Sequence, residues 1–474
     1  MKERYPLSFG QERLWFLERL VAGSAFYHLS AAMRVTGPLR RSALQQAVAG
    51  LLARHEVLRT RIETTDGVPA QVLVAAPALE ILHLSGGSEA AAMEAVATRA
   101  RRPFRLDSEP LVRPYLVRLG PAEHVLVITL HHMVADAWSF GIMFRELWAL
   151  YDAAVAGQPA ALAPLTVQYG DYAVRQRAWL ADQRLCGAET EFWRGELAGA
   201  PVVLELPADR PRPAVFSYRG GRAVFRIDPP LARRLRLLAR QHRATLFSVS
   251  LAAFGVLLAR WSGELDMLIG VPVAGRGRRE LEGLIGFFAN TMAIRVDGAD
   301  DPAFSELLGR VQQRVLRALA HQDMPFELLV ERLCPDRDLS RNPLVQVMFQ
   351  VDTTPPGASA RPAGITTQWL SWGEHSSSHF DLSVLLTADD GGLTGAFTYA
   401  TDLFDQQTME RVAGFYVRLL GRVTADPALR ISELTLAAPA RLRPRPRPLK
   451  RRLSRQRAPA PTAPRRTRRH RSRR

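Results

Sequence analysis

Residues 123–139 read EHVLVITLHHMVADAWS, and they combine two structural patterns with a group of ionisable side chains. The apolar run at residues 125–130 has the length of a strand, and an unbroken run is typical of a strand covered on both faces. After Ser139, apolar residues recur with helical spacing until a glycine and a proline: Phe140, Phe144, Leu147, Tyr151, Ala154, Gly157 and Pro159. The stretch therefore predicts a strand, a connection holding two histidines and an aspartate, and a helix that starts after Ser139.

Helical and strand patterns alternate outward from this stretch through residues 1–440, without an internal repeat. Short strands are predicted at residues 267–275, 287–296 and 344–352, and a hairpin at residues 389–392. We therefore expect a mixed α/β protein with two lobes of similar build, residues 1–180 and residues 181–440. A proline-rich passage at residues 206–221, LPADRPRPAVFSYRGG, is the candidate junction between them.

The net charge of +17 is concentrated at one end of the chain. Residues 441–474 hold 16 of the 63 basic residues and no acidic one, so residues 1–440 carry 47 basic and 46 acidic residues. The segment is rich in Arg and Pro and has few apolar residues, which predicts disorder. It is either a basic arm that binds polyanions, or a linker or the product of an interrupted or frame-shifted gene.

Composition also bears on the cellular compartment. The two cysteines, Cys186 and Cys334, have no metal-ligand spacing and fit free thiols in a reducing compartment. The start of the chain has no apolar signal core, and the longest apolar stretch, at residues 248–258, is too short to span a bilayer. We expect a cytoplasmic protein that is not membrane-bound.

The paired histidines allow three interpretations. A metal site is disfavoured, because a strand that continued through His132 would turn His131 to the opposite face, and His55 and His321 stand in no ligand spacing. The pair can instead be packed and hydrogen-bonded at the end of a strand. Alternatively, one ring lies in a cleft as an acid/base group, with Asp136 either orienting it or pairing with an arginine. Spacing alone leaves the last two open.

Segments elsewhere in the chain decide between them. LHHMVADAWS resembles the HHxxxDG motif of non-ribosomal peptide synthetase condensation domains. Further segments resemble the same family in the family's order: LSFGQERLWFLERL from Leu7, RHEVLRT from Arg54, YGDYAVRQ from Tyr169, IGFFANTMAIR from Ile285, HQDMPFELLVERL from His321, RDLSRNPLVQVMFQ from Arg337, and then HFDLSVLL and GAFTYATDLFD. The likeness extends to about residue 435.

The resemblance implies a fold and a reaction. The fold is two lobes like chloramphenicol acetyltransferase, arranged as a V-shaped pseudo-dimer with a central tunnel. In the reaction, the amine of an aminoacyl thioester on one carrier protein attacks a donor acyl or peptidyl thioester on another and forms an amide. The domain is expected to bind no cofactor and no metal, because its substrates arrive on phosphopantetheine arms. Expected partners are the donor and acceptor carrier proteins and an adenylation domain downstream.

The resemblance also assigns roles to residues in the central motif. His132 is expected to be the catalytic histidine in mid-tunnel, with His131 and Asp136 holding the loop. Asp136 is expected to pair with an arginine, for which Arg276 and Arg59 are the candidates.

Four further residues are expected to line the tunnel: Ala137, Trp138, Ser139 and Asn290. Ala137 departs from the family's pattern, which has glycine after the aspartate. The added methyl group can narrow the tunnel, and alanine gives up the left-handed backbone conformations that glycine adopts freely.

The motifs most resemble domains that join an L-configured donor to an L-configured acceptor. Two alternatives on the same fold stay open: a catalytically silent module that recruits a carrier protein or tailoring enzyme, and a stand-alone acyltransferase with a soluble acceptor. A nucleic-acid-binding protein driven by the basic tail is disfavoured, because it leaves the ordered motifs unexplained.

Overall fold

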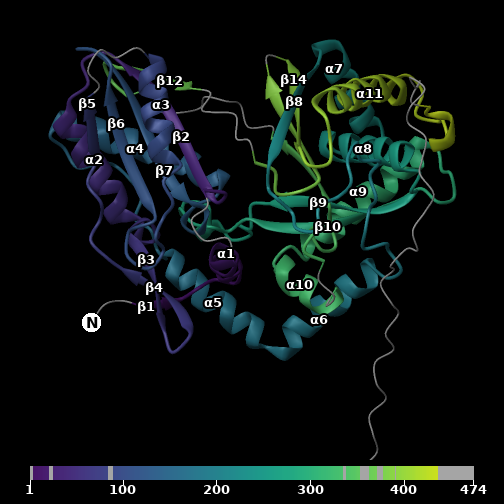
Figure 1. Cartoon of the computed structure of the whole chain (residues 1–474), viewed down its shortest axis with the longest axis horizontal. Helices are drawn as coiled ribbons and strands as arrows, with labels where there is room; N and C mark the ends of the chain where they lie inside the picture. The colour runs from purple at the N-terminus through teal and green to yellow at the C-terminus, as the bar shows by residue number, and fades with distance from the viewer. Residues whose placement is uncertain are drawn as a thin grey trace, which may run out of the picture.

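The computed structural model describes residues 4–20, 25–83, 89–334, 338–352, 362–370, 377–389 and 391–435. Two lobes stand apart at the top of Figure 1 and meet at its base, which gives the molecule a V shape. The predicted tail at residues 441–474 lies outside the described residues.

The first lobe contains a five-stranded sheet in the order β12-β2-β7-β6-β5 and a three-stranded sheet in the order β1-β4-β3. Its strands from the first half of the chain are β1 (Arg4–Pro6), β2 (His28–Thr36), β3 (Thr60–Thr65), β4 (Val68–Leu73), β5 (Glu80–His83), β6 (Val112–Arg118) and β7 (Glu123–His131). Its helices are α1 (Phe9–Leu20), α2 (Arg41–Arg54), α3 (Glu89–Ala100) and α4 (Ala137–Ala156).

The second lobe is built on a six-stranded sheet in the order β10-β9-β11-β13-β14-β8. Its strands are β8 (Gly220–Ile227), β9 (Asp266–Val273), β10 (Asn290–Asp297), β11 (Val347–Asp352), β13 (Leu382–Asp389) and β14 (Gly392–Ala400). Its helices are α7 (Pro229–Gln241), α8 (Leu246–Ser262), α9 (Phe304–Ala320), α10 (Phe326–Leu333) and α11 (Gln406–Ala425). The hairpin predicted at residues 389–392 joins β13 to β14 in antiparallel register.

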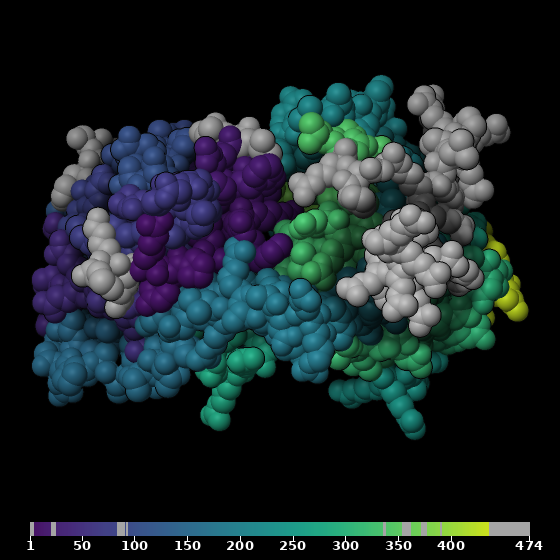
Figure 2. Space-filling model, turned by 90° about the horizontal axis from the view of Figure 1, so that it is seen from below, coloured from purple at the N-terminus to yellow at the C-terminus, as the bar shows by residue number. Residues whose placement is uncertain are grey.

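Helices α5 (Tyr169–Ala181) and α6 (Gln183–Glu196) connect the lobes along the base of the V. In the view from below, the blue-to-teal residues of this stretch run across both halves of the molecule (Figure 2). The chain changes direction at Asp182, which ends α5 and caps α6 by accepting hydrogen bonds from two backbone amides of that helix.

Strand β7 is covered on both faces, as its unbroken apolar sequence predicts. Leu126, Ile128 and Leu130 join the main core of the first lobe, which α2 and α4 also build. Val125 and Val127 join a smaller core on the opposite face, to which α3 contributes. The alternation follows from the pleat of the strand, which turns successive side chains to opposite faces.

Two segments from the second half of the chain pack into the first lobe. Residues 279–288 contribute Leu281, Leu284, Ile285 and Phe288 to its main core. The short strand β12 (Thr366–Leu370) pairs antiparallel with β2 and forms an edge of the five-stranded sheet. We call residues 274–289 the crossing loop, because they leave β9, reach the first lobe and return to β10.

Several predicted boundaries are wrong; the strands predicted at 267–275 and 344–352 are β9 at Asp266–Val273 and β11 at Val347–Asp352. Helix α4 starts at Ala137, three residues before the predicted start, because Asp136 rather than Ser139 is its N-cap and accepts a hydrogen bond from the Ser139 amide at 3.0 Å. The strand predicted at residues 287–296 begins at Asn290, since residues 287–289 belong to the crossing loop. The predicted end of α4 is confirmed, because Gly157 closes it in the left-handed conformation.

Within the described part of the chain, no single helix is long and apolar enough to cross a membrane. Helices α7 and α8 meet the length and composition requirement only as a pair, and they are bent by 103° at the break between them.

Candidate active site

His132 lies just beyond the end of β7, where the chain enters a short 3-10 turn, His132–Val134. Its backbone amide donates to the Tyr27 carbonyl oxygen at 2.7 Å, which fixes the turn against the start of β2. Its ring Nδ1 lies 2.8 Å from the Ala135 carbonyl oxygen. Because a carbonyl oxygen only accepts, Nδ1 carries the proton and Nε2 is left with a lone pair.

His132 is half-buried, whereas its neighbour His131 is fully buried. Phe287 of the crossing loop packs edge-on against it, with ring centroids 4.8 Å apart. Burial lowers the pKa of His132 below its ordinary value of 6.5, although the Asp136 carboxylate and the Ala135 carbonyl act in the opposite direction. The ring is therefore neutral at cellular pH and able to accept a proton or a hydrogen bond at Nε2.

His131 has a different environment, although it precedes His132 in the chain. Its side chain is fully buried, and its Nδ1 accepts a hydrogen bond from the Met133 amide at 3.2 Å. Its Nε2 lies 3.7 Å from the Glu18 carboxylate. His131 thus supports the turn from inside the core, while His132 is the member of the pair with an accessible ring.

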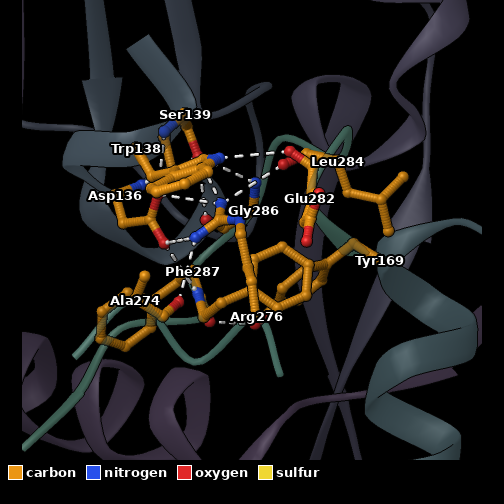
Figure 3. Close-up of polar contacts among 12 residues, drawn as sticks. Asp136, Trp138, Ser139, Tyr169, Ala274, Arg276, Glu282, Leu284, Gly286 and Phe287 are labelled. Carbon is orange, nitrogen blue, oxygen red and sulfur yellow. Dashed lines mark hydrogen bonds and ion pairs between the residues drawn. The ribbon is translucent and has the colours of Figure 1, made fainter. Parts of the chain in front are cut away.

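Asp136 is the centre of a buried polar cluster (Figure 3). Arg276 holds both of its carboxylate oxygens, at 2.7 Å and 3.0 Å, and the two side chains are 3% and 2% exposed. The same carboxylate accepts from the Ser139 amide and hydroxyl and from the Phe288 amide. The Asp136 side chain therefore attaches the crossing loop to the start of α4.

Of the two arginines considered for Asp136, the structure pairs it with Arg276, and the suggestion for Arg59 is wrong. Arg59 lies in the 3-10 turn that follows α2, and its guanidinium is 3.5 Å from the carboxylate of Glu56. The physical reason is topological, because the crossing loop carries Arg276 across from the second lobe to the N-terminus of α4.

The residues after Asp136 divide between solvent and core. Ala137 and Trp138 are exposed, and the Trp138 indole donates to the Glu282 carbonyl oxygen at 3.2 Å. Ser139 is 1% exposed and bonds to the Asp136 carboxylate and the Gly286 carbonyl oxygen, so its assignment as a tunnel-lining residue is wrong.

The departure at Ala137 carries no backbone strain. Ala137 is the first residue of α4 and is not among the described residues with positive φ, so the position requires no glycine.

Asn290 lies at the start of β10, where the crossing loop returns to the second lobe. Its side-chain amide donates to the carbonyls of Gln322 and Met324, and its oxygen accepts from the Phe326 amide.

A pocket lies between the two lobes. Its lining includes Ser8, Gly10, Tyr172, Phe287, Asn290 and Pro325. Phe287 lines this pocket and also packs against the His132 ring.

His379 is a site residue that the sequence did not single out. Its ring stacks on Tyr27 at 5.4 Å and meets Tyr218 edge-on at 5.8 Å, so side chains of both halves of the chain meet there. Burial, the nearby His132 and Arg13 lower its pKa to about 4, against a hydrogen bond to Phe26. The sequence signal that could have found His379 is its position at the start of the motif HFDLSVLL. Histidine is the side chain whose ordinary pKa lies near neutrality, so a histidine in a motif is a candidate site residue.

Other histidines named from the sequence support the framework. His55 is fully buried, bonds to Glu146 at 2.8 Å and accepts from the Ile285 amide of the crossing loop at 3.4 Å. His321 bonds to Glu189 at 2.9 Å and stacks on Phe192. Across the described ranges, no three or more His, Cys, Asp or Glu side chains are placed to hold a metal ion.

Comparison with known proteins gives the same family over nearly the whole chain. The condensation-domain profile matches residues 1–442, and the chain belongs to the condensation-domain family. It is 40% identical over 444 residues to one of the linear gramicidin synthase proteins of Brevibacillus parabrevis, covering 92% of this chain and 6% of that protein. It is 42% identical over 437 residues to phosphinothricin tripeptide synthetase PhsC of Streptomyces viridochromogenes, covering 90% of this chain and 40% of that protein.

Among solved structures, the complex of the X-domain and OxyB from teicoplanin biosynthesis contains a similar chain. The similarity has a TM-score of 0.84 and 35% identity, and covers 92% of this chain and 97% of that one. The two lobes therefore have the chloramphenicol acetyltransferase-like fold that the motifs implied. The chain spans less than half the length of either of the two synthetases.

Proposed function

We propose that this chain forms an amide bond between two carrier-bound substrates in non-ribosomal peptide synthesis. The donor is an acyl or peptidyl thioester, and the acceptor is the amine of an aminoacyl thioester. Family membership supports the reaction class. The observation that carries the proposal is the His132 ring, which is neutral, half-buried and held through Nδ1 so that Nε2 is free to accept.

In the proposed reaction the acceptor nitrogen attacks the thioester carbonyl carbon, the carbon–sulfur bond breaks, and the phosphopantetheine thiol leaves. The amine loses one proton, which His132 Nε2 accepts and passes to the departing sulfur. Orienting the two reactants can contribute roughly 7–11 kcal/mol, whereas a general base gives about 10²- to 10⁴-fold. Positioning by His132 and the two lobes is thus the larger expected effect.

The expected partners follow from this chemistry. Two carrier proteins would deliver the substrates on phosphopantetheine arms, and the domain itself would hold no cofactor. The interlobe pocket beside Phe287 and Asn290 supports an approach route for one of these arms. We further propose an L-configured donor and acceptor, an adenylation domain as a neighbour in the assembly, and a cytoplasmic location.

The direct test is His132→Ala, assayed with both loaded carriers. We expect a loss of amide formation of about 10²-fold or more, because both orientation and proton acceptance are removed. His242→Ala is the matched control, since His242 is an exposed histidine at the end of α7. Unchanged amide formation by His132→Ala would remove His132 from the mechanism. Amide formation from a free amine, without a second carrier, would instead favour the stand-alone acyltransferase.

A second candidate function is recruitment of a partner protein. The similar X-domain of teicoplanin biosynthesis was solved in complex with OxyB, so a chain of this fold can bind another protein. Recruitment predicts that the wild-type chain forms no amide from loaded carriers yet binds a tailoring enzyme. Amide formation that depends on His132 contradicts it.

A further inference from the structure

Glu18 is a buried carboxylate that the proposed reaction does not use. It lies on α1 and is 6% exposed, although most residues of its type lie in water. Among the described residues, no donor lies within hydrogen-bond distance of its Oε2. The free energy of removing a carboxylate from water is several kcal/mol unless a partner offsets it. The position of Glu18 therefore requires an explanation.

The basic group nearest this carboxylate is the ring of His131. Glu18 Oε2 and His131 Nε2 are 3.7 Å apart, which is too long for a hydrogen bond but close enough for the carboxylate to attract an N–H dipole at Nε2. Both atoms lack a hydrogen-bond partner among the described residues. The rings of Tyr27, His28 and Phe104 surround His131, with centroids 6.1–6.3 Å from its own. The ring is thus enclosed, with a carboxylate at its Nε2 side.

The other ring nitrogen fixes the tautomer. His131 Nδ1 accepts a hydrogen bond from the Met133 amide, so Nδ1 must be unprotonated. The single proton of the neutral ring is then on Nε2, and it faces Glu18. If the ring proton were on Nδ1 instead, it would face the Met133 N–H, and two hydrogen-bond donors would point at each other. The neighbouring carboxylate favours the tautomer that the turn needs.

We propose that Glu18 is a positioning residue for His132. It holds the Nε2–H tautomer of His131, His131 anchors the Met133 amide, and that amide belongs to the His132–Val134 turn that presents the His132 ring. The consequence for amide formation rests on the proposed function, whereas the tautomer does not.

Two substitutions separate the effect of the Glu18 side-chain oxygens from that of packing. Glu18→Met keeps the side-chain length but removes both oxygens, and we expect kcat to fall about 10- to 100-fold, as when a partner that orients a functional histidine is lost. KM for each loaded carrier should change little, since substrate contacts are unaltered. Glu18→Gln keeps an acceptor oxygen and should stay close to wild type. Glu12→Met is the matched control, because Glu12 lies on the same helix and pairs with Arg177 instead.

The second readout is the ¹⁵N spectrum of the histidine rings in the intact chain, with His131 assigned by difference against His131→Asn. We expect an Nε2-protonated His131 in wild type and Glu18→Gln, and a mixture of tautomers in Glu18→Met. Wild-type kcat in Glu18→Met, equal loss in both variants, or an Nδ1-protonated wild-type ring would each overturn the proposal. If Glu18→Met fails to fold, the wild-type and Glu18→Gln spectra still decide. If wild type forms no amide, the proposed function fails while the tautomer remains testable.

Discussion

Asp136 connects the two halves of the site through a single side chain. It caps α4, accepts from the Phe288 amide and pairs with Arg276 through both oxygens. The sequence predicted an aspartate–arginine pair but could not choose the arginine, because Arg59 and Arg276 are both distant from Asp136 in the sequence. The contacts support a structural role for Asp136, since its carboxylate is saturated by protein donors.

Asp136→Ala should destabilise the chain by about 3–5 kcal/mol, because it leaves the Arg276 guanidinium buried without a counter-charge. The free energy of unfolding, measured by urea titration, tests this. Asp182→Ala is the matched control: Asp182 also caps a helix but is exposed, and losing a cap alone costs about 1 kcal/mol. An Asp136→Ala variant that unfolds like the Asp182→Ala control, yet is inactive, would argue for a direct chemical role instead.

The crossing loop is the element that brings the second half of the chain to the first-lobe site. It carries Arg276 to Asp136 and Phe287 to the His132 ring. The loop closes at its base, where Gly275 has φ of +63° and lies against the backbone oxygen of Phe288. Glycine is required there, both because the left-handed conformation disfavours a side chain and because no space exists for one.

Gly275→Ala should therefore open the base of the loop and displace Arg276. The left-handed conformation alone costs roughly 1–2 kcal/mol in a residue with a side chain, and the collision with Phe288 adds to this. We expect a lower melting temperature together with reduced amide formation. Gly277→Ala is the control in the same loop, since its added carbon would meet only Asp323 at 3.9 Å. Equal stability of the two variants would show that the loop base is not constrained.

At the scale of secondary-structure elements, the sequence predicted which segments form helices and strands better than it predicted which elements pack or pair together. The β13–β14 hairpin and the two covered faces of β7 follow from local patterns, and both are confirmed. The pairing of β12 with β2 joins residues more than 300 positions apart, and a single strand pattern contains no information about its partner. The crossing loop is similar, because nothing in its local sequence indicates that Leu281 and Ile285 pack into the core of the first lobe.

The whole molecule is two lobes joined by helices α5 and α6 and by two segments of the second half of the chain that pack into the first lobe. β12 completes a sheet of the first lobe, and the crossing loop adds side chains to its core. Burial lowers the pKa of four histidines among the described residues: His28 at the start of β2, His124 in β7, His132 at the site and His379 in the second half of the chain. The lowered pKa values of these histidines therefore depend on the folding of the whole molecule.

Acidification should destabilise the molecule before most of its carboxylates titrate. Burial, as the main cause, lowers the pKa of both His28 and His379 to about 4, so between pH 6.5 and 4 the unfolded chain binds protons that the folded chain does not. Stability is unaffected above pH 6.5 and falls below it, by about 2 kcal/mol per histidine at pH 5. Melting temperatures from pH 8 to 5 measure this.

The double variant His28→Asn with His379→Phe, which keeps a donor near the Ala100 carbonyl oxygen and a ring on Tyr27, should flatten the dependence of melting temperature on pH. The exposed control His242→Asn should follow wild type, and a double variant with the wild-type slope would show that these two rings do not set the acid sensitivity.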